Sequence, residues 1–294
     1  MLRSLLFHGV ASLALLLTLP KAGIAEDVKV MSFNIRLGSA NDKENSWPHR
    51  KEFLVETIKA FDPDLLGTQE TEKSQKDFLD EQLKGYTSLG VGRVDGKDKG
   101  EMMALYYKTA RFNQLDGGHF WLSETPEIVG SKSWDSSLPR MVTWVKLQDN
   151  LQPNGPPLWF FNTHFDHLGK VARAESAKLI RQRIAELPQG AAVIVTGDFN
   201  ASEGSEPYQN LFAEKEGSQL LKDTFRLAHP GRLKQEGTFN KFDPNSRDGA
   251  RIDWIAVTDA LSVESARINY VSKEGRVPSD HFPIEVVLKY QKAK

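Results

Sequence analysis

Short apolar runs recur along the chain, and they limit the folds open to it more than any other feature. The runs at 28–33, 65–68 and 191–196 are too short for helices and have polar or turn-forming neighbours, so we predict buried strands. In the middle and at the end of the chain, such runs follow one another without a helical segment between them. A single doubly wound sheet requires regular strand–helix alternation, so the pattern favours two packed sheets with helices outside. The predicted strands lie at 28–33, 65–68, 102–107, 141–147, 158–162, 191–196, 252–257 and 284–289.

Three helices are predicted from apolar spacing and from the residues that bound them. The first begins at Trp47-Pro48, because Asn45-Ser46 can cap it and proline suits a first helical turn, and Asp62-Pro63-Asp64 ends it. The other two cover roughly 74–83 and 172–187. With no repeat, linker or low-complexity run in between, residues 26–294 are predicted to form one domain. Polar, glycine-rich loops are expected at 85–101, 123–140 and 228–251.

The first 25 residues form a separate segment. Arg3 gives it a positive start, residues 5–19 are almost wholly apolar, and small residues follow Pro20 as far as Ala25. This pattern predicts a secretory signal peptide at 1–25, since a membrane span needs ~20 apolar residues. An uncleaved N-terminal anchor is the alternative. We therefore expect an exported protein, periplasmic or extracellular, without a stable membrane span after cleavage.

Charge and cysteine content restrict the partners. The chain has 38 Lys and Arg against 39 Asp and Glu, a formal net charge of −1. A nuclease that grips long nucleic acid usually carries a basic excess, and this chain has none overall, although a local basic cleft could hide in the average. The absence of cysteine rules out disulfides and thiolate metal ligands, and it is compatible with the periplasm or the cell exterior.

Polar side chains stand at the boundaries of six predicted strands. The loops at strand ends are where sheets present functional groups. One such residue would more often be a cap or a turn, but six segments rich in acids, amides and histidine are hard to explain by turn chemistry alone. The six segments are Asn34-Ile35-Arg36, Gln69-Glu70, Asn162-Thr163-His164, Gly197-Asp198-Phe199-Asn200, Ile252-Asp253-Trp254 and Ser279-Asp280-His281.

These segments, in this order, resemble the motifs of the endonuclease/exonuclease/phosphatase superfamily. The basic loop at 92–101 and the aromatic and basic segment at 120–140 resemble a little-characterised bacterial branch of it that is often exported. The resemblance spans residues 31 to 283 and becomes strong only when all six segments are taken together. It implies an α/β fold, a four-layered sandwich of two packed mixed β-sheets flanked by helices, which agrees with the strand pattern. It also implies a metal-dependent phosphoester hydrolase, either a phosphatase or a phosphodiesterase, that uses a histidine-activated water.

The resemblance implies a divalent-cation site. Glu70 is the best candidate ligand, because a hard carboxylate suits Mg²⁺ or Mn²⁺. Asn34 resembles the amide that supports the metal and the phosphate, and Asp280 resembles the second acid near the metal. The expected cofactor is therefore Mg²⁺ or Mn²⁺.

The remaining motif residues resemble the family's catalytic set. His281 is the candidate general base, since an imidazole titrates near neutral pH, and Asp253 resembles the carboxylate that orients it. Asp198 is expected to orient the attacking water, and Asn200 to donate to the phosphoryl oxygens. His164 resembles the family's second histidine, which stabilises developing charge or assists the leaving group.

Two other hypotheses remain open. The segment Asn162-Thr163-His164-Phe165-Asp166-His167 is one residue away from a dinuclear-zinc signature, so zinc bound through His164, Asp166 and His167 is a remote alternative. It would leave Glu70, Asp198 and Asp280 without a joint purpose. A binding module that has lost catalysis is the third class, and the near-complete set of acids and histidines argues against it.

Substrate identity is less constrained, because superfamily motifs indicate the reaction and not the substrate. We expect a phosphorylated small-molecule or lipid-linked substrate, and a secreted endo- or exonuclease acting on DNA or RNA is the alternative. The oligomeric state is not predicted. Candidate substrate-binding residues come from the motif and from two loops with basic and aromatic residues: Arg36, Arg93, Lys99, Arg140 and Trp134.

Overall fold

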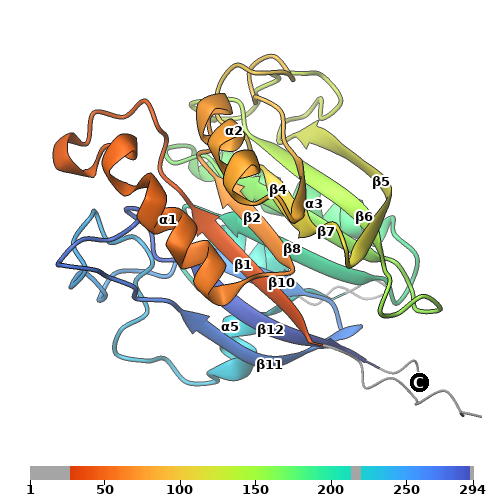
Figure 1. The fold of residues 1–294 in the computed structure, drawn as a ribbon. Helices are drawn as coiled ribbons and strands as arrows, with labels where there is room; N and C mark the ends of the chain where they lie inside the picture. The colour runs from red at the N-terminus through yellow and green to blue at the C-terminus, as the bar shows by residue number, and fades with distance from the viewer. Residues whose placement is uncertain (1–26, 213–219, 292–294) are drawn as a thin grey trace, which may run out of the picture.

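The apolar runs form the interior of two six-stranded sheets in the computed structural model, which describes residues 27–212 and 220–291 (Figure 1). Every predicted strand is present, with bounds that shift by at most a few residues. The predicted signal peptide at 1–25 lies outside the described residues. These strands are β1 (Val28–Asn34), β2 (Leu65–Gln69), β4 (Leu105–Lys108), β6 (Met141–Asp149), β7 (Leu158–His164), β8 (Ala192–Asp198), β10 (Asp253–Val257) and β12 (Ile284–Tyr290).

Both sheets are mixed, as expected. The first has the order β11-β12-β1-β2-β4-β3, with β11 (Leu261–Ile268) and β3 (Tyr86–Leu89) at its edges. The second has the order β5-β6-β7-β8-β10-β9, with β5 (Phe112–Trp121) and β9 (Lys222–Asp223) at its edges. Each sheet has one parallel pair at its centre, β1 with β2 and β7 with β8, and its other pairs are antiparallel.

The four strands that the sequence did not predict are these four edges. The expectation of a loop over 85–101 was wrong at β3, whose residues are all only half-buried. In β5, residues 113–116 are exposed and Gly117 and Gly118 follow, so no apolar run marks the strand. An edge strand is partly open to solvent, and its sequence therefore lacks the continuous apolar signal of an interior strand.

Three layers of apolar contacts hold the two sheets and their helices together. The middle layer lies between the sheets, where Val30 and Leu65 belong to the same buried cluster as Phe160 and Ile194. An outer layer joins the first sheet to α1 (Trp47–Phe61) and α2 (Lys73–Gln82). The opposite outer layer joins the second sheet to α3 (Lys170–Ala185) and α4 (Glu206–Phe212), so the architecture is a four-layered sandwich.

The three predicted helices are present, and the residues at their ends show which contacts start and stop them. Ser46 precedes α1 but makes no side-chain cap hydrogen bond, whereas Asp62 ends the helix in a left-handed conformation. A capping box of Glu72 and Gln75, which the sequence analysis did not identify, begins α2. Shorter elements, η1 (Lys43–Asn45), α4 and α5 (Thr224–Ala228), were not predicted. Within the described residues, no helix is long and apolar enough to cross a membrane.

The polar segments meet because of strand register. Asn34 at the end of β1 lies beside Gln69 at the end of β2, and His164 at the end of β7 lies beside Asp198 at the end of β8. Asp198 also pairs with Asp253, the first residue of the antiparallel β10. Both sheets therefore present polar residues at the same end of the sandwich.

Candidate active site

A cavity of about 350 Å³ opens at this end of the two sheets. It contains residues from both sheets and from the loops that follow their strands. Its walls are formed by Arg36, Leu37, Glu70, Glu101, Leu138, Arg140, His164, His167, Asp198, Asn200, Phe239, Ile252, Asp280 and His281.

Asn34 connects the acids of the two sheets. Its Nδ2 donates to Glu70 Oε1 at 3.0 Å and to Asp198 Oδ2 at 2.9 Å, while its Oδ1 accepts from the backbone N of Arg36 at 3.0 Å. A second donor, the backbone N of Leu37, reaches Glu70 Oε2 at 3.1 Å. Asn34, which the sequence analysis placed at the metal, orients two carboxylates through its Nδ2.

Three residues that line the cavity have left-handed backbone conformations. Arg36, Glu70 and Asn200 have φ values of 56°, 58° and 47°. Such conformations are uncommon for residues other than glycine and persist where the surroundings hold them. The conformation of Asn200 is stabilised by a hydrogen bond from its backbone N to Asp198 Oδ1 at 2.9 Å.

Two acids, Glu70 and Asp280, lie close together on the side of the cavity that the first sheet forms. Arg36 lies between them, with Nη1 3.9 Å from Glu70 Oε2 and Nε 3.7 Å from Asp280 Oδ2. Burial and the negative charge of Glu70 raise the pKa of Asp280 to about 6, although the cations around it act in the opposite direction. The side chain of Arg36 itself is bound to Asp42 at 2.9 Å, so it compensates the two acids only from a distance.

This donor set fits a divalent cation. Ligand atoms of Glu70, His164 and Asp198 all lie within 4.8 Å of one another, and so do those of Asp198, Asp253 and His281. Burial first, and then the charge of Glu70, raise the pKa of Asp280, so its charged form is disfavoured at this place. Carboxylate oxygens are the ligands that hard divalent cations prefer.

His281 and Asp253 form a buried pair. His281 Nδ1 lies 2.9 Å from Asp253 Oδ2, and Nε2 lies 3.8 Å from Asp198 Oδ2. Burial lowers the pKa of His281, but the carboxylates of Asp253 and Asp198 outweigh burial and raise it well above its ordinary value. Asp253 therefore binds the Nδ1 edge of the ring, and Nε2 remains available to a ligand in the cavity.

His164 is held in a different state. Its Nε2 lies 3.0 Å from Asn200 Nδ2, which also donates to the backbone O of Phe165 at 3.1 Å. Burial, followed by the charge of Arg140, lowers the pKa of His164 to about 3. His164 is thus a neutral imidazole at physiological pH, and Nε2 accepts the bond that Asn200 donates.

The remaining residues of the zinc hypothesis do not join these ligands. Asp166 is buried among hydrogen-bond donors of its own, and His167 Nδ1 lies 3.0 Å from Arg140 Nη2. In the part of the chain that the structure describes, neither belongs to a group of acids and histidines that could hold a metal ion.

The predicted substrate-binding residues divide into two sets. Arg36 and Arg140 line the cavity, whereas Arg93, Lys99 and Trp134 do not. Arg93 is 5% exposed and is bound through both Nη atoms to Glu101, which itself lines the cavity. Lys99 lies in an exposed loop, where its backbone N donates to Asp95.

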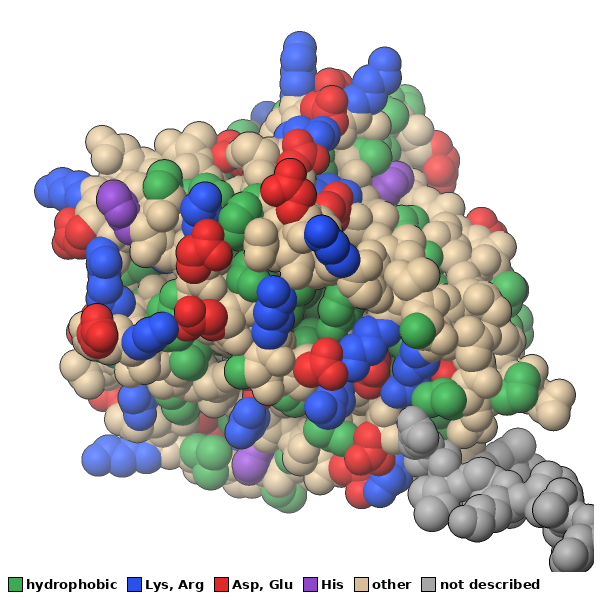
Figure 2. All heavy atoms as spheres, in the orientation of Figure 1, with side chains coloured by type: hydrophobic (Ala, Val, Ile, Leu, Met, Phe, Trp, Pro, Cys, Tyr) green, Lys and Arg blue, Asp and Glu red, His purple; other side chains and the backbone are tan. Residues whose placement is uncertain are grey.

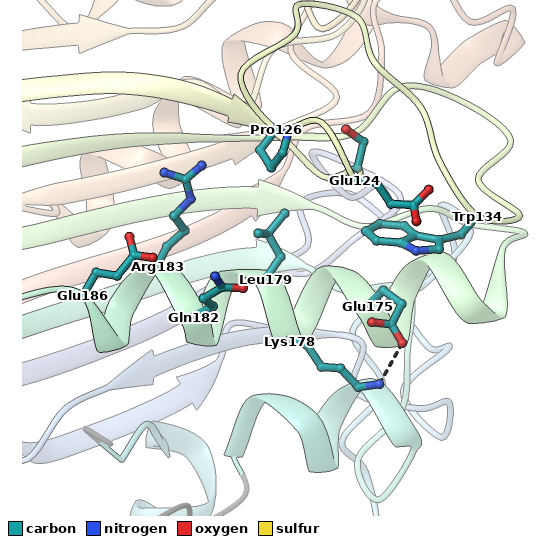
Figure 3. A pocket seen from close by; sticks show the side chains of 10 residues that line it. Glu124, Pro126, Trp134, Glu175, Lys178, Leu179, Gln182, Arg183 and Glu186 are labelled. Carbon is teal, nitrogen blue, oxygen red and sulfur yellow. Dashed lines mark hydrogen bonds and ion pairs between the residues drawn. The ribbon is translucent and has the colours of Figure 1, made fainter. Parts of the chain in front are cut away.

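Trp134 lies at a second hollow, away from the acids. This hollow measures about 470 Å³ and lies between the 123–134 segment and α3. Figure 3 shows the indole beside Glu124 and Glu175, with Leu179 farther along the helix and Pro126 on the loop that faces it. The sequence grouped Trp134 with Arg140 because both lie in one segment of basic and aromatic residues. In the structure, Trp134 lines the second hollow, whereas Arg140 lines the cavity with the acids.

Sequence reasoning missed the residues that hold the site through backbone carbonyls. Arg50 of α1 is buried; its Nη1 donates to the backbone O of Ile35 at 2.6 Å and of Pro278 at 3.2 Å. It thereby joins the loop after β1 to the loop before β12, and burial lowers its pKa to about 10. Gln75 of α2 donates to the backbone O of Arg36 at 2.9 Å. The sequence signal for Arg50 was weak, because it consists of one basic residue on the inner face of an amphipathic helix.

Comparison with known proteins gives a consistent result. A model of the Endonuclease/Exonuclease/phosphatase family matches residues 31–281. A solved endonuclease/exonuclease/phosphatase family protein from Bacteroides thetaiotaomicron is 36% identical, with a TM-score of 0.84 over 91% of this chain and 99% of that one. A solved mannosyl-6-phosphatase from the same species is 37% identical, with a TM-score of 0.82 over 90% of this chain and 100% of that one.

A more distant relative has a different activity. The CCR4-Not complex 3′-5′-exoribonuclease subunit Ccr4 of Saccharomyces cerevisiae is 24% identical over 84% of this chain. The match covers only 36% of that protein's length.

Proposed function

The chain belongs to the endonuclease/exonuclease/phosphatase family and is therefore a hydrolase of phosphoric ester bonds, and from this premise we propose that it is a Mg²⁺- or Mn²⁺-dependent phosphatase acting on small phosphorylated molecules. The observation that carries the proposal is the cavity itself. Its volume of about 350 Å³ lies at the lower end of the range for small-molecule pockets, and its acids, histidines and arginines converge on that space.

A sugar phosphate is the substrate class that we favour. The similar solved protein, 37% identical over 90% of this chain, is a mannosyl-6-phosphatase. A hexose phosphate has a size that this small cavity accommodates, and the cavity offers both charged groups for the phosphate and apolar side chains such as Leu138 and Phe239 for the sugar. A lipid-linked phosphate ester would satisfy the same chemistry and belongs among the substrates to be tested.

Charge argues against long nucleic acid. Binding several phosphates requires several unpaired lysines or arginines. Arg36 is bound to Asp42 and Arg93 to Glu101, so that Arg140, which lies beside Asp166, remains to serve one phosphate and not a long backbone. Figure 2 shows basic and acidic side chains interspersed over the face in view. The nuclease alternative rests on the 24% identical Ccr4 match.

The residues of the cavity divide the work of hydrolysis. Nε2 of His281, oriented by Asp253, is the atom that meets the attacking water, and Asp198 accepts that water's second hydrogen bond. The carboxylates of Asp253 and Asp198 favour the protonated ring, and only the neutral ring, formed once their charge is offset, takes the proton of the water. His164 and Asn200 face the phosphoryl oxygens from β7 and the loop after β8. Glu70 and Asp198, whose ligand atoms lie within 4.8 Å of each other, would hold the cation, with Asp280 as the further acid that lines the cavity. The cation would supply positive charge to the phosphate oxygens and offset the acids around His281.

The experiment is a substrate panel with Mg²⁺ present. Hexose phosphates, inositol phosphates, phospholipids, RNA and plasmid DNA are offered at equal phosphate concentration to the wild type and to His281→Ala. We expect the highest kcat/KM on a hexose phosphate, and loss of that activity in the variant. Preferential cleavage of RNA or DNA at physiological salt would show that the chain is a nuclease.

Export remains part of the proposal. It is supported by Arg3, the apolar run at 5–19 and the small residues up to Ala25. Intact-mass analysis of the native protein should find a chain that begins at or near Glu26, and a chain that retains Met1 would contradict cleavage.

A further inference from the structure

Arg140 is a buried cation with an unused donor. Its side chain is 3% exposed and lines the cavity, and Nη1 has no hydrogen-bond partner among the described residues. Nη2 lies 3.0 Å from His167 Nδ1, and Nε lies 3.4 Å from Asp166 Oδ2. Leaving a buried charged donor without an acceptor is costly, so a donor of this kind at a cavity wall points to an acceptor supplied by a ligand.

Asp166 holds this guanidinium without satisfying it. Its Oδ1 accepts from the backbone N of Leu168 and Gly169 at 3.0 and 2.7 Å, and its Oδ2 accepts from Ser137 Oγ at 2.7 Å. Burial opposes ionisation, but these bonds outweigh it and hold the pKa of Asp166 well below its ordinary value. The carboxylate is thus a fixed anion that ties the start of α3 to the loop carrying Arg140.

His167 holds the guanidinium from the other side. An arginine can only donate, so Nη2 is the donor and His167 Nδ1 accepts, which leaves the proton of this neutral ring on Nε2. With two of its nitrogens engaged, the planar guanidinium has a fixed orientation, and Nη1 is the buried nitrogen that has no partner among the described residues.

Arg140 is one of two arginines that line the cavity, and the other, Arg36, is bound to Asp42 at 2.9 Å. Charge compensation for a phosphate beside His164 therefore depends on Arg140, which keeps a donor without a partner among the described residues.

We propose that Arg140, held by Asp166 and His167, binds a terminal oxygen of the scissile phosphate and makes the enzyme selective for monoesters over diesters. This inference rests on the proposed phosphatase function. A monoester carries close to two negative charges at neutral pH and a third terminal oxygen for Nη1 to bind. In a diester that oxygen carries a second substituent, which would meet the wall formed by Arg140 and Leu138.

The test compares two substrates with the same leaving group, p-nitrophenyl phosphate and bis(p-nitrophenyl) phosphate. In Arg140→Gln, we expect kcat/KM for the monoester to fall roughly 10²-fold, the size of a lost charge-assisted hydrogen bond, while kcat/KM for the diester changes little. Arg173→Gln is the matched control, because Arg173 donates to the backbone O of Asp166 and does not line the cavity.

Binding of inorganic phosphate gives a readout that does not depend on turnover. Phosphate should raise the melting temperature of the wild type and of Arg173→Gln, and this rise should be lost in Arg140→Gln. If Arg140→Gln does not fold, Arg140→Lys decides by the same two measurements, since lysine keeps the charge without the planar fork. We expect its monoester preference and phosphate response to fall between those of the wild type and background.

The outcomes separate this inference from the proposed function. An equal loss on both substrates, or an unchanged phosphate response in the Arg140 variant, would overturn the role of Arg140 and leave the phosphatase intact. A wild type that hydrolyses the diester but not the monoester would overturn the phosphatase function and this inference with it.

Discussion

The acids at the cavity are buried next to one another, and Asp280 shows what this arrangement costs. The pKa of Asp280 is raised to about 6 in the folded protein, above the ordinary value of 3.8. The folded chain therefore binds more protons than the unfolded chain between these values, and stability falls as pH rises through this window. A shift of this size corresponds to roughly 3 kcal/mol as an upper bound.

Asp280→Asn should accordingly stabilise the chelator-treated protein. At pH 7.5 we expect a gain of about 1–3 kcal/mol in the free energy of unfolding, which disappears at about pH 3, below both pKa values, where Asp280 is protonated in the folded and the unfolded chain. Urea unfolding at the two pH values measures this, and Asp98→Asn in an exposed loop is the control. A variant that is less stable than wild type at pH 7.5 would contradict the destabilising effect assigned to the buried charge of Asp280.

His281 and Asp253 should act as one unit. Removing a positioned base lowers turnover by roughly 10²–10⁴-fold, so His281→Ala should show a loss of this size in kcat with the fold intact. Asp253→Asn should reproduce much of it, because Asp253 Oδ2 fixes the ring at 2.9 Å. The double variant should be little worse than the worse single one, and losses that multiply would disprove the pairing.

At the residue scale, the site was predictable where it coincides with strand ends. Glu70, Asp198 and His281 come together because their strands end or begin at the same place, and sequence order marks those places. Arg50 and Gln75 were missed because they bind backbone carbonyls, which any residue can offer. The unused donor of Arg140 depends on contacts between the loop before β6 and the loop after β7, and no local pattern records such contacts.

At the scale of elements, interior strands were predictable and edges were not. β1 and β8 are buried along nearly their whole length, so their apolar runs are continuous. β3 and β11 expose part of one face and read as loop sequence. Register across the two sheets could not be predicted, because it depends on which strands pair.

Gly67 of β2 tests how closely the two sheets approach. A Cβ there would lie 2.2 Å from Thr196 Oγ1 and 2.7 Å from Asn162 Oδ1, two atoms that hydrogen-bond to each other at 3.0 Å. Gly67→Ala should therefore lower the free energy of unfolding by about 1–3 kcal/mol through overpacking. Chemical unfolding measures the change. Gly85→Ala, where a Cβ meets nothing within 4 Å, is the control, and equal stability of the two variants would contradict the close approach.

On the scale of the whole molecule, two sheets from separate parts of the chain each supply half of the chemistry. Glu70 and Asp280 belong to the first sheet's end, and His164 and Asp198 to the second's. Asn34 Nδ2 joins the halves by contacting Glu70 and Asp198. The packing between the sheets is thus a condition for a complete site, and a cation shared by both would stabilise their approach.

The metal dependence of phosphate release from a hexose 6-phosphate tests the central claim most directly. The wild type and Glu70→Gln are treated with a chelator, and the rate is followed as Mg²⁺ or Mn²⁺ is restored. We predict no turnover in the chelator, full recovery of the wild type, and a much higher Mg²⁺ requirement in Glu70→Gln, because the amide lacks the carboxylate charge. Full wild-type activity in the chelator, or recovery with Zn²⁺ alone, would contradict a hard-cation site at Glu70.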